Sequence, residues 1–342
     1  MWRKKRFYII IALVFILGTT AYMNRGALVM MGFDWFLQGH VEGKLQETYK
    51  PLEGREPTVV SKKKQDPFSI LLLGIDQRGN EIGRSDSLLY TVVRPQDGHM
   101  LLLSIPRDLY VDIVGKERKD KINHAYAFGG AGMTIDTAEK LFDAPIDYYA
   151  SINFEGFRDV IEAIGGIALP IDEDIVNDDP GHEYFVIKGG QDLYNGVDAL
   201  NYVRYREDSD MNRTERHQQF LHAIIEKAMK LKQWSKIPSL IDIMGDNFST
   251  DIPPGKLVDL AQQMLSSEQL QMYSHTLKGK GSRLKNGGAW YYFADEEDLG
   301  DVQAMIQNWL NPNVPSSQLI LPPKYASDEE LDRGMIAQPQ GN

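Results

Sequence analysis

Residues 69–105 read SILLLGIDQRGNEIGRSDSLLYTVVRPQDGHMLLLSI, and this stretch contains three apolar runs of strand length. The runs occupy 69–75, 87–93 and 100–105, and polar segments rich in turn residues separate them. Short apolar runs bounded by turn residues are typical of β-strands. Because these runs are nearly continuously apolar, we expect a sheet that is buried on both faces by helices.

Helical patterns follow the three strands. They are predicted at 154–164, 196–205, 214–232, 235–244 and 254–265, with one further short strand at 167–171 after Gly165-Gly166. This mixture of strands and helices favours an α/β fold, with a single mixed sheet covered by helices in α/β/α layers, over residues 67–322. Residues 323–342 are polar and are predicted to form a flexible C-terminal tail.

The N-terminus combines a basic flank with an apolar run. Residues 1–6 read MWRKKR, and residues 7–23 are mostly apolar. We expect a cytoplasmic tail at 1–6, a transmembrane signal anchor at 7–25 and a juxtamembrane segment at 26–66. The positive flank places the N-terminus inside and the following domain outside the cell membrane. A cleaved signal peptide is the alternative, but Tyr22 and Met23 match a cleavage site poorly.

Charge and cysteine content exclude several classes of protein. The chain has a net charge of −11, and its first 25 residues contain basic but no acidic side chains, so the remainder is more acidic still. A nucleic-acid-binding domain normally carries a basic excess, so no nucleic-acid partner is expected. The chain contains no cysteine, so its fold depends on its core and not on disulfide bonds.

An arginine cluster interrupts this acidic composition at residues 202–219, which read YVRYREDSDMNRTERHQQ. Arg216 precedes Phe220 by four residues and Arg213 precedes Arg216 by three, the spacings that place side chains on one face of a helix. Both arginines therefore lie on the apolar stripe of the helix predicted at 214–232. Asn212 and Glu215 resemble a helix cap and its capping-box partner. Arginines that face inward at a helix N-terminus indicate a phosphate or pyrophosphate pocket, because guanidinium groups bind such oxygens bidentately.

Arg204 and Arg206 belong to the same cluster. Two residues apart on one helix, they would point to nearly opposite faces, so both can face one pocket only if the helix from Gly196 ends near Tyr205. The alternative interpretation is a set of solvated ion pairs between the arginines and the acidic residues Glu207, Asp208, Asp210 and Glu215. The sequence leaves both interpretations open.

Three further groups of polar residues lie at the ends of the predicted strands. Asp76 ends the first strand, and Arg84 and Asp86 begin the second, so the two carboxylates could bind one hard cation. Arg107 follows the third strand, where residues of open α/β sheets line ligand crevices. Residues 121–130, KINHAYAFGG, could form a pocket wall. The alternative for each is a turn residue that bonds its own backbone.

These elements, in this order, resemble the LytR-CpsA-Psr family. The likeness covers roughly residues 67–232 and includes the motifs LLLGID, RSDS, LLSIPRDLYV, KINHAYAFGG, NFEGFRDVIEAIGGI, GGQDLYNGVDALNYVRYR and DSDMNRTERHQQ. It implies a membrane-anchored phosphotransferase that moves a phosphorylated glycopolymer, teichoic acid or similar, from a polyprenyl-pyrophosphate carrier to a peptidoglycan hydroxyl. Two departures from the family pattern are Asp210-Met211-Asn212 in place of Asp-Phe-Gly and His217 in place of Gln.

The resemblance also assigns roles to residues. Asp76 and Asp86 would hold Mg²⁺ (or Mn²⁺), and Asp76, Asp86 and Arg107 form the catalytic set. Pyrophosphate would be bound by arginines, for which the candidates are Arg84, Arg107, Arg204, Arg206, Arg213 and Arg216. One carboxylate of the Asp pair is the candidate base, and an apolar groove for the isoprenoid tail is implied by the resemblance alone. Two alternatives remain: a polyprenyl-pyrophosphate hydrolase and a non-catalytic wall-binding or regulatory protein.

Overall fold

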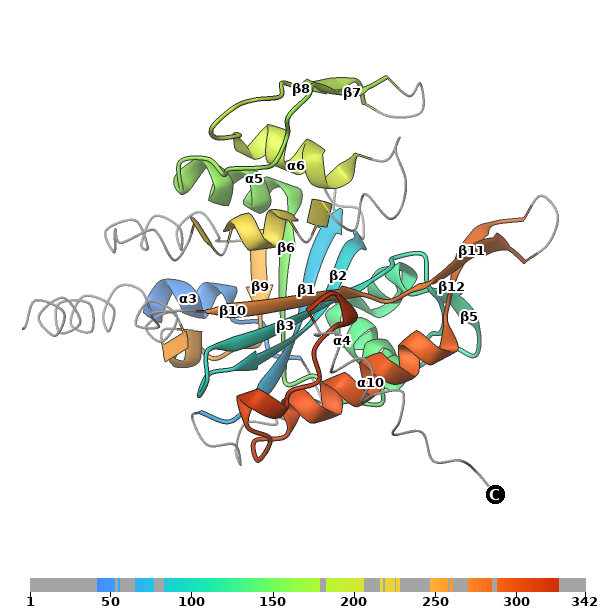
Figure 1. Cartoon of the computed structure of the whole chain (residues 1–342). Helices are drawn as coiled ribbons and strands as arrows, with labels where there is room; N and C mark the ends of the chain where they lie inside the picture. The colour runs from blue at the N-terminus through green and yellow to red at the C-terminus, as the bar shows by residue number, and fades with distance from the viewer. Residues whose placement is uncertain are drawn as a thin grey trace, which may run out of the picture.

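The computed structural model describes residues 42–52, 55, 65–76, 83–178, 183–205, 216–217, 219–224, 226–227, 247–257, 259–260, 270–284 and 288–325. Within them lies one mixed six-stranded sheet, flanked by helices on both faces (Figure 1). The strand order is β10 (Gln271–Thr276), β3 (His99–Ile105), β2 (Arg84–Arg94), β1 (Phe68–Asp76), β6 (Tyr148–Asn153) and β9 (Phe248–Thr250).

The pairing of the strands makes the sheet mixed. β1 is antiparallel to β2 and parallel to β6, while β3 is antiparallel to β2 and parallel to β10. β9 closes the far edge antiparallel to β6. The three strands predicted from the apolar runs are therefore confirmed, and they form the adjacent strands β1, β2 and β3.

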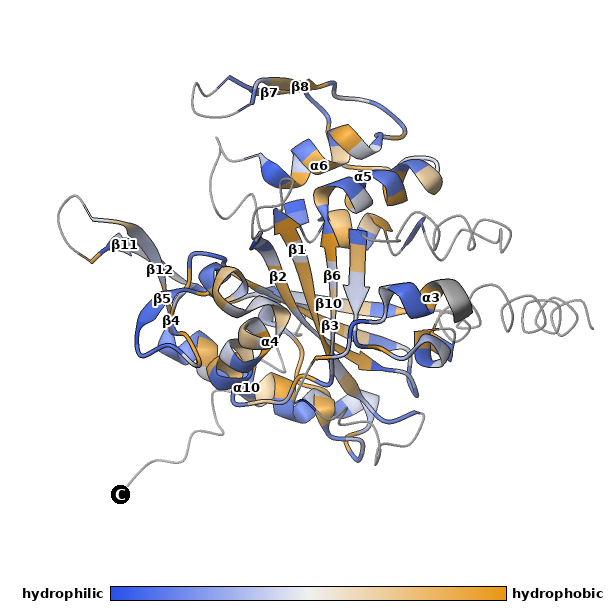
Figure 2. Cartoon of the chain, turned by 180° about the vertical axis from the view of Figure 1, so that it is seen from behind, coloured by the Kyte–Doolittle hydropathy of each residue, from blue (hydrophilic) through white to orange (hydrophobic). Residues whose placement is uncertain are grey.

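One face of the sheet packs against two long helices, α4 (Asn123–Phe142) and α10 (Glu296–Leu310). Alternate residues of β1, β2 and β3 point into this layer, where they meet the apolar stripes of the helices. Figure 2 shows the apolar strands between the helical layers. The largest fully buried side chain of the described residues is Trp309 of α10, and its Nε1 donates to the Ile320 carbonyl at 2.8 Å. Burial of this stripe is what holds the layer in place.

The other face is covered by α5 (Phe154–Ala163) and α6 (Gly196–Arg204). Each helix begins at an asparagine: Asn153 accepts from the Gly156 amide and Asn195 from the Asp198 amide, both at 2.8 Å. Side-chain caps of this kind satisfy amides that the first helical turn leaves unpaired. Both helices match the predictions at 154–164 and 196–205, and α6 ends before Tyr205 as expected.

Three hairpins project from the layers. They are β4 (Tyr110–Asp112) with β5 (Lys119–Lys121), β7 (Ile175–Asn177) with β8 (Phe185–Ile187), and β11 (Gly279–Arg283) with β12 (Trp290–Ala294). Two short 3₁₀ turns, η5 (Ser316–Gln318) and η6 (Pro323–Tyr325), follow α10. The prediction of a strand at 167–171 was wrong. Within this segment only Ile167 forms a β-bridge, to Tyr194, because the segment packs against α6 instead of pairing with the sheet.

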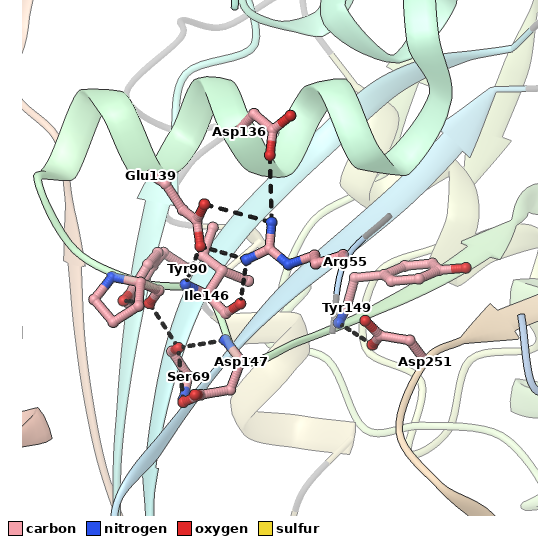
Figure 3. A network of polar contacts seen from close by, with 10 residues as sticks. Arg55, Ser69, Tyr90, Asp136, Glu139, Ile146, Asp147, Tyr149 and Asp251 are labelled. Carbon is pink, nitrogen blue, oxygen red and sulfur yellow. Dashed lines mark hydrogen bonds and ion pairs between the residues drawn. The ribbon is translucent and has the colours of Figure 1, made fainter. Parts of the chain in front are cut away.

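The segment before β1, predicted as juxtamembrane, is tied to the domain at two points. The helix α3 (Glu42–Thr48) precedes Lys50, whose amide donates to the Thr250 carbonyl at 2.7 Å. Figure 3 shows Arg55 between Asp136 and Glu139 of α4, and its Nη2 also donates to the Ile146 carbonyl at 2.6 Å.

The predicted anchor at 7–25 lies outside the described residues, as do the helix at 235–244 and the tail beyond residue 325. No helix within the described part is long and apolar enough to cross a membrane. Of the helices predicted at 214–232 and 254–265, the described residues 216–217, 219–224, 226–227, 254–257 and 259–260 are helical.

Candidate active site

Asp86 occupies a β-bulge at the end of the β1–β2 pair. Gly74 is opposite Ser87, but Ile75 is opposite Ser85, so Asp86 is the extra residue on β2. A bulge of this kind turns one side chain out of the regular alternation of the strand. Because of the bulge, Asp86 faces the helical layer of α5 and α6, where it lines a cavity.

Arg107 reaches Asp86 from the adjacent strand. It follows the end of β3, and its Nη1 donates to Oδ1 of Asp86. Its Nε lies 3.5 Å from Oδ2 of the next residue, Asp108, which also accepts from Lys121 Nζ at 2.6 Å. The side chains of Asp86 and Arg107 are 17% and 18% exposed. The structure therefore brings two of the predicted catalytic residues into direct contact.

Asp76 and Arg84 complete the predicted strand-end group. They face each other in the β1–β2 register, one step beyond the bulge. Asp76 alternates with the buried Ile75 and so belongs to the same strand face as Gly74, which lines the cavity beside Asp86. Asp76 is half-buried, while Arg84 is exposed. The two predicted carboxylates thus lie on neighbouring strands and on one face of the sheet.

An apolar cavity of about 260 Å³ separates this part of the sheet from α5, α6 and the helical residues His217, Phe220, Leu221 and Ile224. Its walls come from β1, β2 and β6 on one side and from the helices on the other. The polar residues among its lining are Asp86, Ser87, Ser151, Asn153, Arg204 and His217, and the other side chains are apolar. Pockets with apolar walls and few polar groups are typical ligand sites.

Arg204 lines the same cavity from the last turn of α6. Its guanidinium carbon lies 4.8 Å from the centre of the Phe154 ring at the start of α5, a cation–π distance. This contact orients the arginine along the cavity wall. Phe154 itself was not singled out in the sequence, although it follows directly after the cap residue Asn153 in the NFEGF motif.

Arg216 is buried at 6% exposure, as the helical stripe predicted. Its Nε donates to the Tyr202 carbonyl at 3.1 Å and its Nη2 to the Tyr205 carbonyl at 2.7 Å. His217 Nε2 lies 2.8 Å from the Val203 carbonyl. These side chains bind carbonyls at the C-terminal end of α6. Arg216 thereby supports the helix end that carries Arg204; a direct pyrophosphate contact stays a prediction.

Several sequence predictions concern residues beyond the described part. Arg206 and Arg213 lie outside it, as do the capping pair Asn212 and Glu215 and the acidic residues considered as ion-pair partners. The KINHAYAFGG motif is described: it forms the start of α4, whose glycines Gly129 and Gly130 depart from helical geometry. With Tyr126 and Tyr149 they line a second cavity of about 450 Å³, so the predicted pocket wall is present.

The described residues hold no cluster of three or more candidate metal ligands. A magnesium ion, however, is usually bound by one or two protein carboxylates together with substrate phosphates and water. Asp76 and Asp86, on neighbouring strands and on one sheet face, supply that donor type. The residues therefore fit an ion that binds together with a phosphorylated substrate.

Comparisons with known proteins agree with this arrangement. The chain is 34% identical over 316 residues to polyisoprenyl-teichoic acid–peptidoglycan teichoic acid transferase TagU of Bacillus licheniformis, covering 90% of this chain and 97% of the relative. The crystal structure of B. subtilis TagV matches with a TM-score of 0.62 at 33% identity, covering 72% of this chain and 98% of that one. The structure of TagT bound to LI-WTA matches with a TM-score of 0.61 at 29% identity, covering 77% and 99%.

The family model for LytR_cpsA_psr matches residues 36–308, which include every strand of the six-stranded sheet, the helices α4, α5 and α6, and all but the last two residues of α10. The match extends well beyond the 67–232 region in which the resemblance was noted, to α10 at the C-terminal side. On this evidence the chain belongs to the LytR-CpsA-Psr family.

Proposed function

We propose that this protein is a phosphotransferase that moves a phosphorylated glycopolymer, teichoic acid or similar, from a polyprenyl-pyrophosphate carrier to a peptidoglycan hydroxyl. The relatives named as teichoic acid transferases support this class of reaction. The observation that carries it is the combination, in one cavity, of apolar walls with Asp86 and Arg204. A polyprenyl pyrophosphate has the same two parts, an apolar tail and a charged head.

The tail is assigned to the apolar part of the cavity and the head to the strand ends. Phe157 and Val160 of α5 face Leu72 and Leu89 of the sheet across the cavity, and none of these can hydrogen-bond to a head group. Burial of isoprenoid carbons against them contributes about 25 cal/mol per Å² of apolar surface. Arg107 and Arg204 supply positive charge next to this surface, where a pyrophosphate can form charge-assisted hydrogen bonds.

The reaction needs one bond formed and one broken. The acceptor hydroxyl oxygen attacks the phosphorus that carries the glycopolymer, the bond from this phosphorus to the bridging oxygen breaks, and polyprenyl phosphate leaves. The hydroxyl proton passes to one carboxylate of the Asp76 and Asp86 pair. Arginines stabilise the charge that develops on the phosphoryl oxygens, which is the main contribution a protein makes to such a transfer.

Asp76 and Asp86 would also hold Mg²⁺ or Mn²⁺, which when bound would neutralise pyrophosphate charge. Asp76→Asn and Asp86→Asn keep the size of the side chain but remove its charge. We expect both variants to lose divalent-ion binding in the presence of the pyrophosphate ligand and to keep a melting temperature near that of the wild type. Full transfer in a chelator, or unchanged ion binding in both variants, would contradict the metal assignment.

The reaction is tested with purified full-length protein, a polyprenyl-pyrophosphate-linked polymer and peptidoglycan free of attached polymer. We expect polymer to become covalently linked to peptidoglycan in equal amount to the polyprenyl phosphate released. Release without linkage, at the same rate with and without peptidoglycan, would indicate the hydrolase instead. Binding of the wall without either product would indicate the non-catalytic alternative.

The anchor and the location outside the membrane form part of the proposal, and they rest on the basic residues 3–6 before the apolar run. Protease added to wall-stripped cells should remove the domain while leaving a membrane-protected N-terminal fragment. Protection of the whole chain would contradict this topology.

A further inference from the structure

The hairpin of β11 and β12 carries an unusual density of aromatic side chains. Strand β12 reads WYYFA, and Figure 1 shows the hairpin standing away from the layers next to β5. Trp290 is 43% exposed, which is high for a residue of this size. On the other face of the strand, Tyr291 packs edge-on against Tyr110 of β4, with ring centres 4.9 Å apart. Tyr292, two residues further on the Trp290 face, packs against the main core, so β12 is anchored on both faces and Trp290 at its start stays partly exposed.

Gly281, which lies diagonally across from Trp290 on β11, explains how the indole is held. A Cβ atom added at Gly281 would lie 2.0 Å from Cζ2 of Trp290, so the six-membered ring rests directly on the glycine backbone. No larger residue fits there without displacing the ring. Trp290 therefore lies against the backbone of β11 on one side, and 43% of the residue remains exposed to solvent. Flat aromatic faces with a polar edge recur at recognition surfaces.

The hairpin is joined directly to the candidate active site. The Tyr292 amide donates to the carbonyl of Asp108 at 2.9 Å, and Asp108 in turn contacts Arg107 at 3.5 Å. Lys121, which binds the Asp108 carboxylate, lies 5.8 Å from the centre of the Tyr291 ring. The aromatic strand and the Asp86–Arg107 pair are thus connected through a single residue.

The charge of the hairpin is opposite to that of the protein. Residues 277–294 include Lys278, Lys280, Arg283 and Lys285 and contain no Asp or Glu, whereas the whole chain carries −11. Arg283 is opposite Trp290 in the register, so both side chains lie on the same face. Its Nη1 donates to the Gly288 carbonyl, which holds the guanidinium beside the indole. Lys280 lies opposite Phe293, on the other face, and Lys278 pairs with Asp298, so it is Arg283 that favours an anionic group beside Trp290.

We propose that this face of the β11–β12 hairpin, with Trp290 and Arg283 at its centre, binds the acceptor glycan strand of peptidoglycan. A sugar ring of the strand stacks on the indole of Trp290, and carboxylates of the peptides that the strand carries meet Arg283. The proposal rests on the proposed function, because it identifies where that reaction takes its acceptor. It separates the two substrates: the carrier lies in the cavity under α5 and α6, and the acceptor approaches past Asp108.

The acceptor fits the hairpin better than a donor polymer of the polyol phosphate type does. A glycan strand of N-acetylhexosamines repeats pyranose rings, each with an apolar face that can stack on an aromatic ring. A polyol phosphate chain has no such rings in its repeat. The exposed indole therefore selects for the first kind of polymer, whereas the basic side chains alone would accept both.

The test uses full-length protein in detergent and two soluble probes. The first is glycan strands with peptides, freed of other wall polymers, and the second is a short-chain polyprenyl pyrophosphate. Trp290→Ala removes the stacking surface, Trp290→Phe keeps a flat ring, and Gly281→Val displaces the indole while leaving it in the chain. Tyr184→Ala serves as the control, because Tyr184 is a 68% exposed aromatic residue beside β8, on a different hairpin.

We expect Trp290→Ala and Gly281→Val to weaken glycan-strand binding about five- to tenfold, with Trp290→Phe recovering most of the loss. Tyr184→Ala should change neither affinity, and the pyrophosphate probe should bind all four variants equally. Unchanged strand affinity in Trp290→Ala and in Gly281→Val, at wild-type melting temperature, overturns the proposal. A loss confined to the pyrophosphate probe also overturns it, because the hairpin would then serve the donor.

The same experiment separates this inference from the proposed function. If strand binding depends on Trp290 but the wild type links no polymer to peptidoglycan, the docking site stands and the transferase function fails. If transfer occurs while strand affinity is independent of Trp290 and Gly281, the function stands and the docking site fails.

Discussion

Arg107 and Asp86 are 21 residues apart in the chain, yet their side chains form a hydrogen-bonded ion pair between the ends of β3 and β2. The pair has a functional consequence. An arginine that already has a carboxylate partner is oriented before a phosphate arrives. Substrate binding then exchanges or extends one charge-assisted contact instead of ordering a flexible side chain.

Arg107→Ala should weaken binding of a short-chain polyprenyl pyrophosphate by about 2–5 kcal/mol, the usual loss when one partner of a buried charge pair is removed. Arg107→Lys should recover little, because a point charge cannot reproduce the two-pronged guanidinium contact. Arg118→Ala is the control, since Arg118 also pairs with an aspartate but is 57% exposed. Calorimetric titration with the short-chain pyrophosphate measures the affinity of each variant. Equal affinities in Arg107→Ala and the control would exclude Arg107 from the pyrophosphate site.

The sequence predicted the centre of the fold better than its edges. The runs that form β1, β2 and β3 are long, apolar and bounded by turns, so the local sequence pattern was enough to predict these strands. Helix α4 was not predicted, because its HAYAFGGAGM segment contains three glycines and little amphipathic contrast. Helix α10 was also not predicted, although Asp295 caps it and acidic residues fill its first turn, which are both signals of a helix start.

The candidate site was predicted residue by residue but not as an arrangement. Asp86 and Arg107 were named, but the bulge that turns Asp86 toward the cavity leaves no trace in a period-two pattern. The burial of Arg216 was anticipated from the helical stripe, whereas its backbone partners at the end of α6 depend on tertiary packing. The aromatic run of β12 was visible in the sequence and was not singled out.

The volume of the cavity under α5 and α6 should limit the length of the polyprenyl chain that the protein can bind. Ala150 of β6 lines the cavity, and Ala150→Phe would fill part of its volume. We expect affinity for a long polyprenyl pyrophosphate to fall about tenfold, because each methylene that can no longer be buried contributes about 0.8 kcal/mol. Affinity for a short-chain pyrophosphate should not change. A comparable loss for both ligands would mean that the variant disturbs the head-group site and that the tail lies elsewhere.

Arg216 offers a test between a structural and a ligand-binding role. Arg216→Met keeps an apolar stem of similar length but leaves the Tyr202 and Tyr205 carbonyls without these donors. Unfolding free energy should fall by about 1–3 kcal/mol, because the variant loses two hydrogen bonds from a charged donor. Arg118→Met, at an exposed site, should cost less than about 0.5 kcal/mol. Unchanged stability together with lost pyrophosphate affinity would instead support the ligand contact predicted from the sequence.

Asp251 is a half-buried carboxylate at the end of β9, close to the segment that precedes β1. Its Oδ1 accepts from the Tyr149 amide at 2.7 Å, a contact drawn in Figure 3. Burial raises the pKa of Asp251 to about 6, and the hydrogen bond from Tyr149 and the charge of Arg55 only partly oppose that rise. The folded protein therefore binds a proton more tightly at this residue than the unfolded chain does.

Because the folded pKa lies above the unfolded value of 3.8, the stabilising contribution of Asp251 is complete below about pH 4 and is lost as the pH rises through 6. Asp251→Asn keeps an oxygen acceptor for the Tyr149 amide but cannot ionise, so its stability should not include this loss. Relative to wild type, the variant should gain about 1–2 kcal/mol between pH 4 and pH 7, a range reduced for solvent screening. Denaturant unfolding at a series of pH values measures the difference. Parallel stability curves for the two proteins across this window would show that Asp251 titrates as it does in the unfolded chain.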